Sequence, residues 1–308
     1  MRFDGDQFKA AAAALGRPAG EGGVPEDAPL WEQTYALACW SAPGPRGAIP
    51  LLTYHRRDLP GPKPAIIYYH GVAQRKEDYL DSHSMSRALA DAGFMVVIPD
   101  APGHGERESA GGLIERLTES LPREFAAAIE QSADEAGALI DWLERRPEVD
   151  VRRIGVIGVS MGGYTAAAVG ARQKERVRAV VCINGAAELE LCMATTDAIA
   201  PGKWGPPDRA IDPRTRQTIA VIDPINYPER FPPLPILLVH GMMDTWNPCI
   251  TSQRFAAALL PHYRPWAERL KLLIVPGAVH WPPNRTMVRE SVAWLLRYVC
   301  DASQEGAR

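Results

Sequence analysis

A serine, an acid and a histidine stand at three turns of this chain from which they could act together on a carbonyl group. Ser160 lies in the sequence Gly158-Val159-Ser160-Met161-Gly162, after the apolar run 154–157 and before the small-residue stretch 164–169. An apolar run, a tight turn and a helix expose a serine hydroxyl at the turn, and the glycines on either side let the backbone pass closely. Such a hydroxyl becomes a nucleophile once a base takes its proton.

The acid and the base follow two later apolar runs. Residues 237–239 lead into His240-Gly241-Met242-Met243-Asp244, and residues 272–275 lead to a turn that ends at His280. The carboxyl ends of parallel strands meet at one edge of a sheet, so we expect Ser160, Asp244 and His280 to converge there. A histidine that takes the serine proton and a carboxylate that orients the histidine complete the machinery of acyl transfer.

These side chains require a sheet of buried strands to hold them. Apolar runs alternate along the chain with helical patterns of 3.6-residue period. We expect strands at 34–41, 47–55, 64–71, 94–98, 154–157, 178–184, 235–240 and 269–275, and helices at 80–92, 123–146, 250–260 and 284–299. Runs that are apolar throughout are typical of parallel strands covered on both faces. The fold class is therefore α/β, with a mostly parallel central sheet and helices on both sides.

One large domain, residues 31–300, accounts for this alternation. Residues 1–30 are expected to form a short helix and a linker at the surface, with packing on the body of the protein or on a partner subunit of a homo-oligomer as alternatives. Residues 301–308 are expected to form a tail. Residues 185–233 interrupt the alternation with an irregular stretch that contains several prolines. Their place before the acid strand makes them a candidate lid over the site, with a surface decoration as the alternative.

The composition excludes several classes of function. The net charge is −3, with 34 basic and 37 acidic residues and no basic stripe, so we expect no nucleic-acid partner. Neither a signal-peptide pattern nor an apolar run of membrane-spanning length appears, so we expect no membrane association. The five cysteines lack the spacing of a disulfide framework or a metal site, which favours a cytoplasmic protein without a bound metal.

The chain resembles the α/β-hydrolases of the prolyl-oligopeptidase and dienelactone-hydrolase-like esterase group over roughly residues 31–299. The resemblance rests on five motifs: His70-Gly71, Pro99-Asp100-Ala101-Pro102-Gly103-His104-Gly105, Gly158 to Gly162, His240 to Asp244, and Gly277-Ala278-Val279-His280. It implies the α/β-hydrolase fold with a small lid insertion, in which serine, acid and histidine follow one another in this order. Two departures stand out: dienelactone hydrolases carry a cysteine where this chain has Ser160, and 30 residues are too few for the propeller domain of oligopeptidases.

The resemblance also implies a role for each site residue. Ser160 would attack the carbonyl carbon, His280 would act as its base, and Asp244 would orient the histidine. The backbone amides of Val72 and Met161 would hold the oxyanion, and no cofactor is implied.

Four further residues are candidates for the substrate pocket: His70, Trp204, Trp246 and Trp281. The two tryptophans that follow the acid and the base could equally pack against the body of the protein. His70 precedes a glycine at a strand end and could equally be structural, although it lies beside the oxyanion turn. Arg75 and Lys76 follow that turn, and we expect both to be solvated.

The sequence therefore predicts a metal-independent serine carboxylesterase acting on small esters with short acyl groups. The same triad serves peptidases, amidases and carbon–carbon bond hydrolases, which motifs alone do not separate. A non-catalytic binding module is a third hypothesis, although none of the three site residues is missing.

Overall fold

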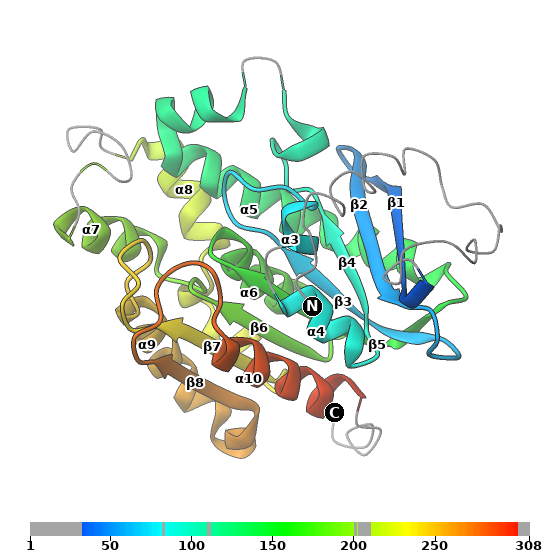
Figure 1. Cartoon of the computed structure of the whole chain (residues 1–308). Helices are drawn as coiled ribbons and strands as arrows, with labels where there is room; N and C mark the ends of the chain where they lie inside the picture. The colour runs from blue at the N-terminus through cyan, green and yellow to red at the C-terminus, as the bar shows by residue number, and fades with distance from the viewer. Residues whose placement is uncertain (1–32, 82–83, 110–111, 200–201, 203–210, 301–308) are drawn as a thin grey trace.

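A single eight-stranded sheet forms the centre of the protein (Figure 1). The structure is a computed structural model that describes residues 33–81, 84–109, 112–199, 202 and 211–300. The strand order is β1-β2-β4-β3-β5-β6-β7-β8. The strands are β1 (Tyr35–Gly44), β2 (Gly47–Arg56), β3 (Lys63–Tyr69), β4 (Met95–Pro99), β5 (Val149–Val159), β6 (Ala179–Ile183), β7 (Ile236–Gly241) and β8 (Leu270–Val275).

The sheet is parallel except at one edge. β1 and β2 form an antiparallel hairpin, and β2 pairs antiparallel with β4. All pairings from β4 through β3 to β8 are parallel. The predicted mostly parallel sheet is therefore confirmed, and the strands predicted at 34–41 and 47–55 form an antiparallel hairpin at its edge.

Helices cover both faces of the sheet, as predicted. α4 (Ser84–Asp91) and α10 (Arg285–Leu295) pack side by side on the near face in Figure 1. α5 (Leu113–Glu144), α6 (Met161–Arg172) and α9 (Ile250–Leu259) contribute to the core on the opposite face. The remaining helical elements are α3 (Asp78–Asp81), α7 (Leu189–Ile199), α8 (Pro213–Ile222), the 3-10 turns Gly105–Arg107, Pro224–Asn226, Pro228–Arg230 and Leu260–Arg269, and a π-helical turn Leu296–Cys300.

Alternate residues of one strand pack into the two cores, which explains why the strands contain continuous apolar runs. In β3, Ile66 and Tyr68 belong to the core on the α4 and α10 side, whereas Ala65 and Ile67 belong to the core on the other side. All four side chains are fully buried. A strand buried on both faces has no solvent-facing positions at which polar residues would alternate.

The long helix α5 begins earlier than the predicted 123–146. It starts at Leu113 and is broken at Ser120, whose backbone leaves the helical region (φ −161°) two residues before Pro122. Proline lacks the amide hydrogen for an intrahelical bond and is tolerated in the first turn, so a second helical segment starts there. Ile114 in the first segment is exposed, so this segment has no continuous buried face. Its sequence therefore lacks the apolar helical period that would predict a helix.

The segment 185–233 is more regular than predicted. It contains α7, α8 and two 3-10 turns. Asp212 caps α8 by accepting hydrogen bonds from the amides of Arg214 and Thr215, both at 3.0 Å, and Pro213 occupies the first turn. The prediction of an irregular stretch was therefore wrong, because a capping aspartate followed by proline is a helix start. The lid role of this segment remains a prediction.

The predicted N-terminal helix and linker (1–30) and the tail (301–308) lie outside the described residues. Within the described ranges, no helix combines the length and the apolar character needed to cross a membrane.

Candidate active site

Ser160 sits at a sharp turn between β5 and α6. Its backbone adopts φ 57° and ψ −122°, a conformation that costs a non-glycine residue of order 1–3 kcal/mol. A side chain on Gly158 would place its Cβ 1.9 Å from the carbonyl oxygen of Gly162, and one on Gly162 would lie 2.0 Å from the carbonyl oxygen of Tyr69. The two glycines are therefore needed where helix α6 passes directly over β3 and β5.

Ser160, His280 and Asp244 form one chain of hydrogen bonds. The Oγ of Ser160 lies 3.0 Å from Nε2 of His280, and Nδ1 of His280 lies 2.8 Å from Oδ2 of Asp244. The three residues come from the carboxyl-terminal sides of β5, β7 and β8, as the sequence predicted for the sheet edge. Because an ionised carboxylate only accepts, His280 donates through Nδ1, which leaves Nε2 free to accept the serine proton.

The carboxylate of Asp244 is buried and fully hydrogen-bonded. Its Oδ1 accepts the amides of Trp246 and Asn247, both at 2.8 Å, and its Oδ2 faces Nε2 of His240 at 3.3 Å as well as His280. Burial alone would raise the pKa of Asp244, but the bonds from His240 and His280 outweigh burial and lower it to about 2. Asp244 is therefore ionised throughout the neutral range.

The two backbone amides predicted to face an oxyanion flank Ser160. Met161 is the first residue of α6, and amides in the first turn of a helix have no intrahelical acceptor. Val72 follows the His70-Gly71 pair, and a Cβ built on Gly71 would lie 3.6 Å from Cβ of Ser160. Both turns therefore border the serine side chain.

His70 supports the oxyanion turn from inside. It is 1% exposed, its Nε2 accepts the amide of Ala101 at 2.9 Å, and its Nδ1 donates to the carbonyl of Gly71 at 2.8 Å. Burial lowers the pKa of His70 below its ordinary value, so the ring is neutral. The prediction that His70 lines the pocket was therefore wrong, and the structural alternative holds, because both ring nitrogens are bonded to backbone in the interior.

Lys76 is buried, contrary to the expected solvated position, whereas Arg75 is exposed as expected. The ammonium group of Lys76 lies 2.7 Å from Asp100 Oδ2 and 2.9 Å from Glu77, and it also contacts Glu106. Burial opposes the charge, but the hydrogen bonds to Asp100 and Glu106 keep the pKa of Lys76 above its ordinary value. This cluster joins the oxyanion turn to the turn after β4, because Asp100 also accepts the amides of Lys76 and Glu106.

The tryptophan candidates occupy different positions. Trp246 is 45% exposed, and its ring centroid lies 6.3 Å from that of His280. Trp281 packs instead on Tyr79, with ring centroids 5.5 Å apart, and belongs to the core on the α4 and α10 side. Trp204 lies outside the described residues.

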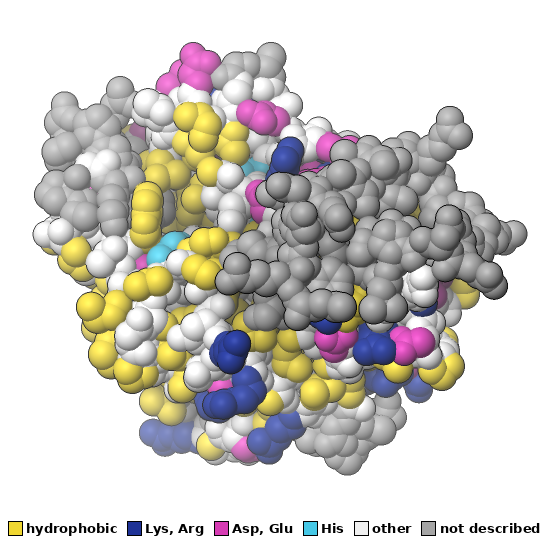
Figure 2. Space-filling model, viewed as in Figure 1, with side chains coloured by type: hydrophobic (Ala, Val, Ile, Leu, Met, Phe, Trp, Pro, Cys, Tyr) yellow, Lys and Arg dark blue, Asp and Glu magenta, His cyan; other side chains and the backbone are white. Residues whose placement is uncertain are grey.

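An exposed apolar rim borders the histidine. It consists of Met242, Met243, Trp246 and Val279, which are between 45% and 58% exposed. The amide of Met243 donates to the carbonyl of Ala278 at 2.9 Å, so the acid and base turns form one surface. Figure 2 shows hydrophobic side chains gathered beside an exposed histidine on one face of the molecule.

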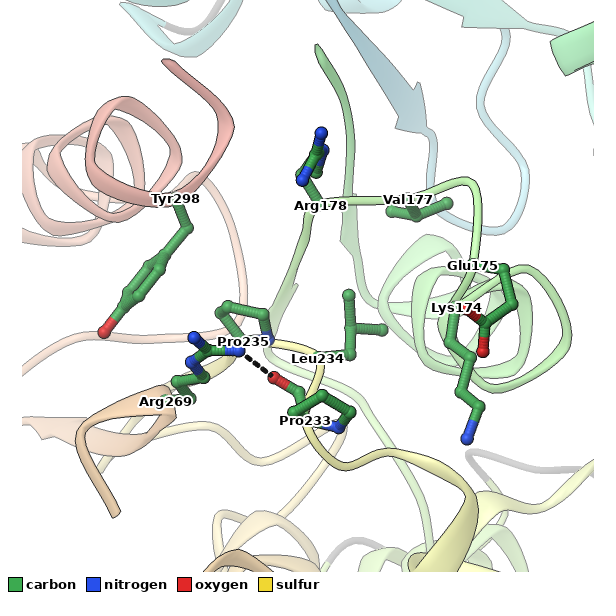
Figure 3. Close-up of a pocket in the computed structure, with 9 residues that line it drawn as sticks. All are labelled: Lys174, Glu175, Val177, Arg178, Pro233, Leu234, Pro235, Arg269 and Tyr298. Atoms are coloured by element: carbon green, nitrogen blue, oxygen red, sulfur yellow. Dashed lines mark hydrogen bonds between the residues drawn. The ribbon is translucent and has the colours of Figure 1, made fainter. Parts of the chain in front are cut away.

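A separate cavity of about 190 Å³ lies at the amino-terminal ends of β6, β7 and β8, away from Ser160 (Figure 3). Its charged groups do not converge on a common point: Arg269 donates to the carbonyl of Pro233, and Arg178 donates to the carbonyl of Arg152. Within the described ranges, no group of three or more His, Cys, Asp or Glu side chains could hold a metal ion.

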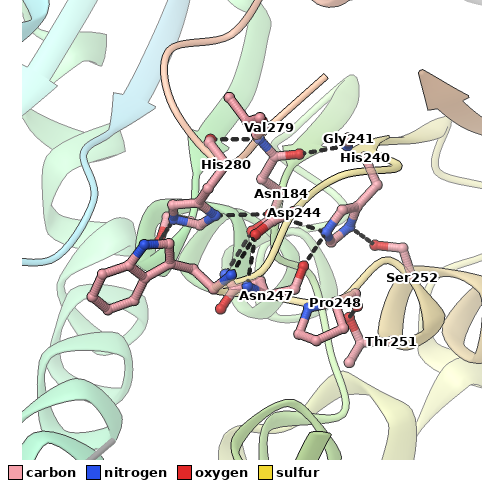
Figure 4. A network of polar contacts seen from close by, with 12 residues as sticks. Asn184, His240, Gly241, Asp244, Asn247, Pro248, Thr251, Ser252, Val279 and His280 are labelled. Atoms are coloured by element: carbon pink, nitrogen blue, oxygen red, sulfur yellow. Dashed lines mark hydrogen bonds and ion pairs between the residues drawn. The ribbon is translucent and has the colours of Figure 1, made fainter. Parts of the chain in front are cut away.

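Sequence reasoning missed the polar residues that hold the acid and base turns. Asn184, Asn247 and Ser252 form a buried network with His240, Asp244 and His280 (Figure 4). The only sequence signal is that Asn184 directly follows the apolar run of β6, at the same edge as the other site residues.

Comparisons with known proteins agree with this fold. The family model described as "Prolyl oligopeptidase family" matches residues 81–305. Esterase YjfP of Escherichia coli K12 is 30% identical over 204 residues, covering 64% of this chain and 75% of that protein. Dipeptidyl-peptidase 5 of Porphyromonas gingivalis is 26% identical over 243 residues, covering 77% of this chain but only 34% of the peptidase.

A solved structure extends the agreement to three dimensions. TT1662 from Thermus thermophilus superposes with a TM-score of 0.62 at 22% identity, covering 86% of this chain and 98% of that protein. At this identity the likeness supports the fold alone. The family match spans well over half of the chain, so this protein is a serine hydrolase with the α/β-hydrolase fold and belongs to the prolyl oligopeptidase family.

Proposed function

We propose that the protein is a serine carboxylesterase that cleaves small esters through an acyl-enzyme. The observation that carries the proposal is the continuous hydrogen-bonded path from Ser160 Oγ through His280 to the ionised carboxylate of Asp244. A serine at a strained turn, a histidine with its Nε2 toward the hydroxyl and a buried carboxylate behind it are the parts that nucleophilic acyl transfer needs.

Acylation begins when His280 Nε2 takes the proton of Ser160 as Oγ attacks the ester carbonyl. The positive charge that develops on the imidazole is stabilised by Asp244, which also fixes the tautomer through Nδ1. The amides of Val72 and Met161 donate to the oxyanion of the tetrahedral intermediate. His280 then gives its proton to the leaving alcohol, and the acyl group remains on Ser160.

Deacylation repeats these steps with water. His280 accepts a proton from a water molecule that attacks the acyl carbonyl, the same two amides hold the oxyanion, and Ser160 leaves with a proton returned by His280. Loss of one oxyanion donor typically lowers turnover by roughly a hundredfold or more.

The apolar rim supports an ester with an apolar group. Met243, Trp246 and Val279 surround the edge of the site on the His280 side and offer no charged group to an ionic substrate. The similarity to Esterase YjfP also supports an ester rather than an amide. We further propose a cytoplasmic location, which the five free cysteines support because disulfides are rare in that compartment.

A peptidase or amidase is the second candidate function. The similarity to dipeptidyl-peptidase 5 and the family description favour it, because the same triad cleaves amides. No specific observation favours a carbon–carbon bond hydrolase.

A p-nitrophenyl ester series from acetyl to palmitoyl, measured beside a matched p-nitroanilide, tests the proposal. Ser160→Ala should lower ester turnover by at least about a thousandfold, because removal of the nucleophile disables the whole triad. Ser109→Ala, which changes an exposed serine elsewhere, should leave turnover unchanged. Ester turnover that survives Ser160→Ala overturns the proposal, and turnover confined to the anilide favours the peptidase alternative.

A further inference from the structure

The side chain of Asn184 lies between the acid turn and the base turn of the site. Asn184 follows the last residue of β6 and is fully buried. Its Nδ2 donates to the carbonyl of His280 at 2.6 Å and to that of Val279 at 3.3 Å, and its Oδ1 accepts the amide of Gly241 at 2.8 Å (Figure 4). One side chain therefore joins the end of β7 to the turn of the base.

The backbone of Asn184 takes part in the same arrangement. Its amide donates to the carbonyl of Val239 at 2.9 Å, and its carbonyl accepts Nδ2 of Asn247 at 2.6 Å. The backbone has φ 53°, in the left-handed region that asparagine adopts more readily than most residues. The orientation of the side-chain amide is fixed by its partners, because two carbonyls require a donor and a backbone amide requires an acceptor.

The bond to His280 lies where the sheet no longer constrains the chain. The ladder between β7 and β8 ends at the pair Gly241 and Val275, five residues before His280. Beyond it, the bond from the amide of Met243 to the carbonyl of Ala278 spans the two turns. The Asn184 amide adds a bond at the histidine itself. A shift of about 1 Å in a catalytic group can cost roughly a hundredfold in rate.

We propose that Asn184 is a positioning residue that holds the imidazole of His280 in line with Ser160 and Asp244 by bonding its backbone carbonyl. The proposal rests on the proposed role of Ser160 as nucleophile but not on the identity of the substrate. It predicts that loss of the Nδ2 donor lowers the reactivity of Ser160 even though Asn184 touches neither the serine nor the substrate.

Asn184→Asp is the sharpest test, because it keeps the shape and the acceptor and replaces only the donor. The new carboxylate oxygen would face the carbonyl of His280 and repel it. The readout is the second-order rate of covalent labelling by a fluorophosphonate, which reports the triad whichever bond the enzyme cleaves. We expect a fall of about 10- to 100-fold at pH 7.5. Asn226→Asp, whose side chain donates to the carbonyl of Ala220 in an exposed turn, is the matched control and should label at the wild-type rate.

The pH dependence separates positioning from a general loss of structure. A protonated carboxyl group can donate as the amide does, so the labelling rate of Asn184→Asp relative to wild type should recover as the pH falls. The titratable groups around this position are Asp244, His240 and His280. A new carboxylate would favour the protonated form of His280 and would therefore lower the ratio as the pH falls, which is opposite to the recovery expected from a restored donor. A ratio near one at pH 7.5, or a reduced ratio that does not change with pH, overturns the proposal.

Asn184→Ser provides a second variant that removes the bonds without burying a charge. We expect it to be reduced in labelling at every pH, without the recovery of the aspartate variant. If Asn184→Ser is labelled at the wild-type rate at pH 7.5, the proposal is also contradicted. Failure of the wild-type protein to cleave p-nitrophenyl esters would count against the esterase function alone, because the labelling ratios do not depend on it.

Discussion

Replacement of Lys76 by methionine tests whether a buried ion cluster holds the oxyanion turn. Methionine keeps most of the length and apolar surface of the lysine stem and removes only the ammonium. The loss falls on Asp100, whose side chain is fully buried and would keep its two backbone amide donors but lose its ion pair with Lys76. Glu106 is 63% exposed and would be solvated by water.

The expected cost follows from this difference in burial. Removing one partner of a buried ion pair typically destabilises a protein by about 3–5 kcal/mol, because the other charge is left uncompensated. In a domain of this size, where 1 kcal/mol shifts Tm by about 2 °C, that loss corresponds to a fall in Tm of roughly 6–10 °C. Lys271→Met is the matched control, since Lys271 is 43% exposed and pairs with Glu290 at the surface. Exposed pairs contribute at most about 1 kcal/mol.

Activity should fall together with stability, because Lys76 lies four residues after Val72 on the same turn. We expect kcat to decrease by up to about a hundredfold, the cost of losing one oxyanion donor, with a smaller change in KM. The assays are urea unfolding at pH 7.5 and p-nitrophenyl ester turnover. The reasoning is refuted if Lys76→Met is as stable as Lys271→Met.

Two further predictions concern the apolar rim and the response to acid. Trp246→Ala should lower kcat/KM for long acyl esters by about five- to tenfold and for the acetyl ester less, since the half-exposed ring offers about 1 kcal/mol of apolar contact; an equal loss along the acyl series would show that the ring does not contact the acyl group. Burial lowers the pKa of His104 to about 4 in the folded protein. As the pH falls, the unfolded chain therefore binds the proton before the folded one does. The stability contributed by the neutral ring is complete above about pH 6.5 and is lost as the pH falls toward 4. His104→Gln should therefore reduce the loss of unfolding free energy between pH 7.5 and 5.0 by about 2 kcal/mol in urea titrations, and an unchanged pH dependence would contradict this assignment.

Much of the fold could be predicted because burial on two faces leaves a strong pattern. Strands β3 to β8 consist largely of apolar residues, and the positions of their carboxyl ends placed Ser160, Asp244 and His280 at one edge. The less regular pieces had weaker signals. The first part of α5 has an exposed isoleucine where a buried face would be needed, and α7 and α8 lie in a segment whose prolines suggested only turns.

The support of the site could not be predicted for a different reason. The bonds from Asn184 reach Gly241 and His280, which are 57 and 96 positions away in the chain. Such contacts have no period and no fixed spacing, so only the folded chain identifies the partners. The prediction that Lys76 is solvated was wrong for the same reason. A lysine in a polar stretch is expected at the surface, and only the folded chain places Asp100 and Glu106 against it.

Each half of the site therefore depends on a buried polar group beyond the end of the sheet. Backbone pairing stops where the strands stop, and the turns that carry the chemistry must be held by side chains. On the oxyanion side this is the charged cluster of Lys76 and Asp100, and on the acid and base side it is the neutral amide of Asn184. The choice of group fits the surroundings: an amide beside Asp244 and His280 adds no charge that would compete with their own ion pair, whereas the oxyanion turn tolerates a full charge because three carboxylates compensate it. Loss of the charge should thus lower both stability and kcat, whereas loss of the amide should act mainly through the reactivity of Ser160.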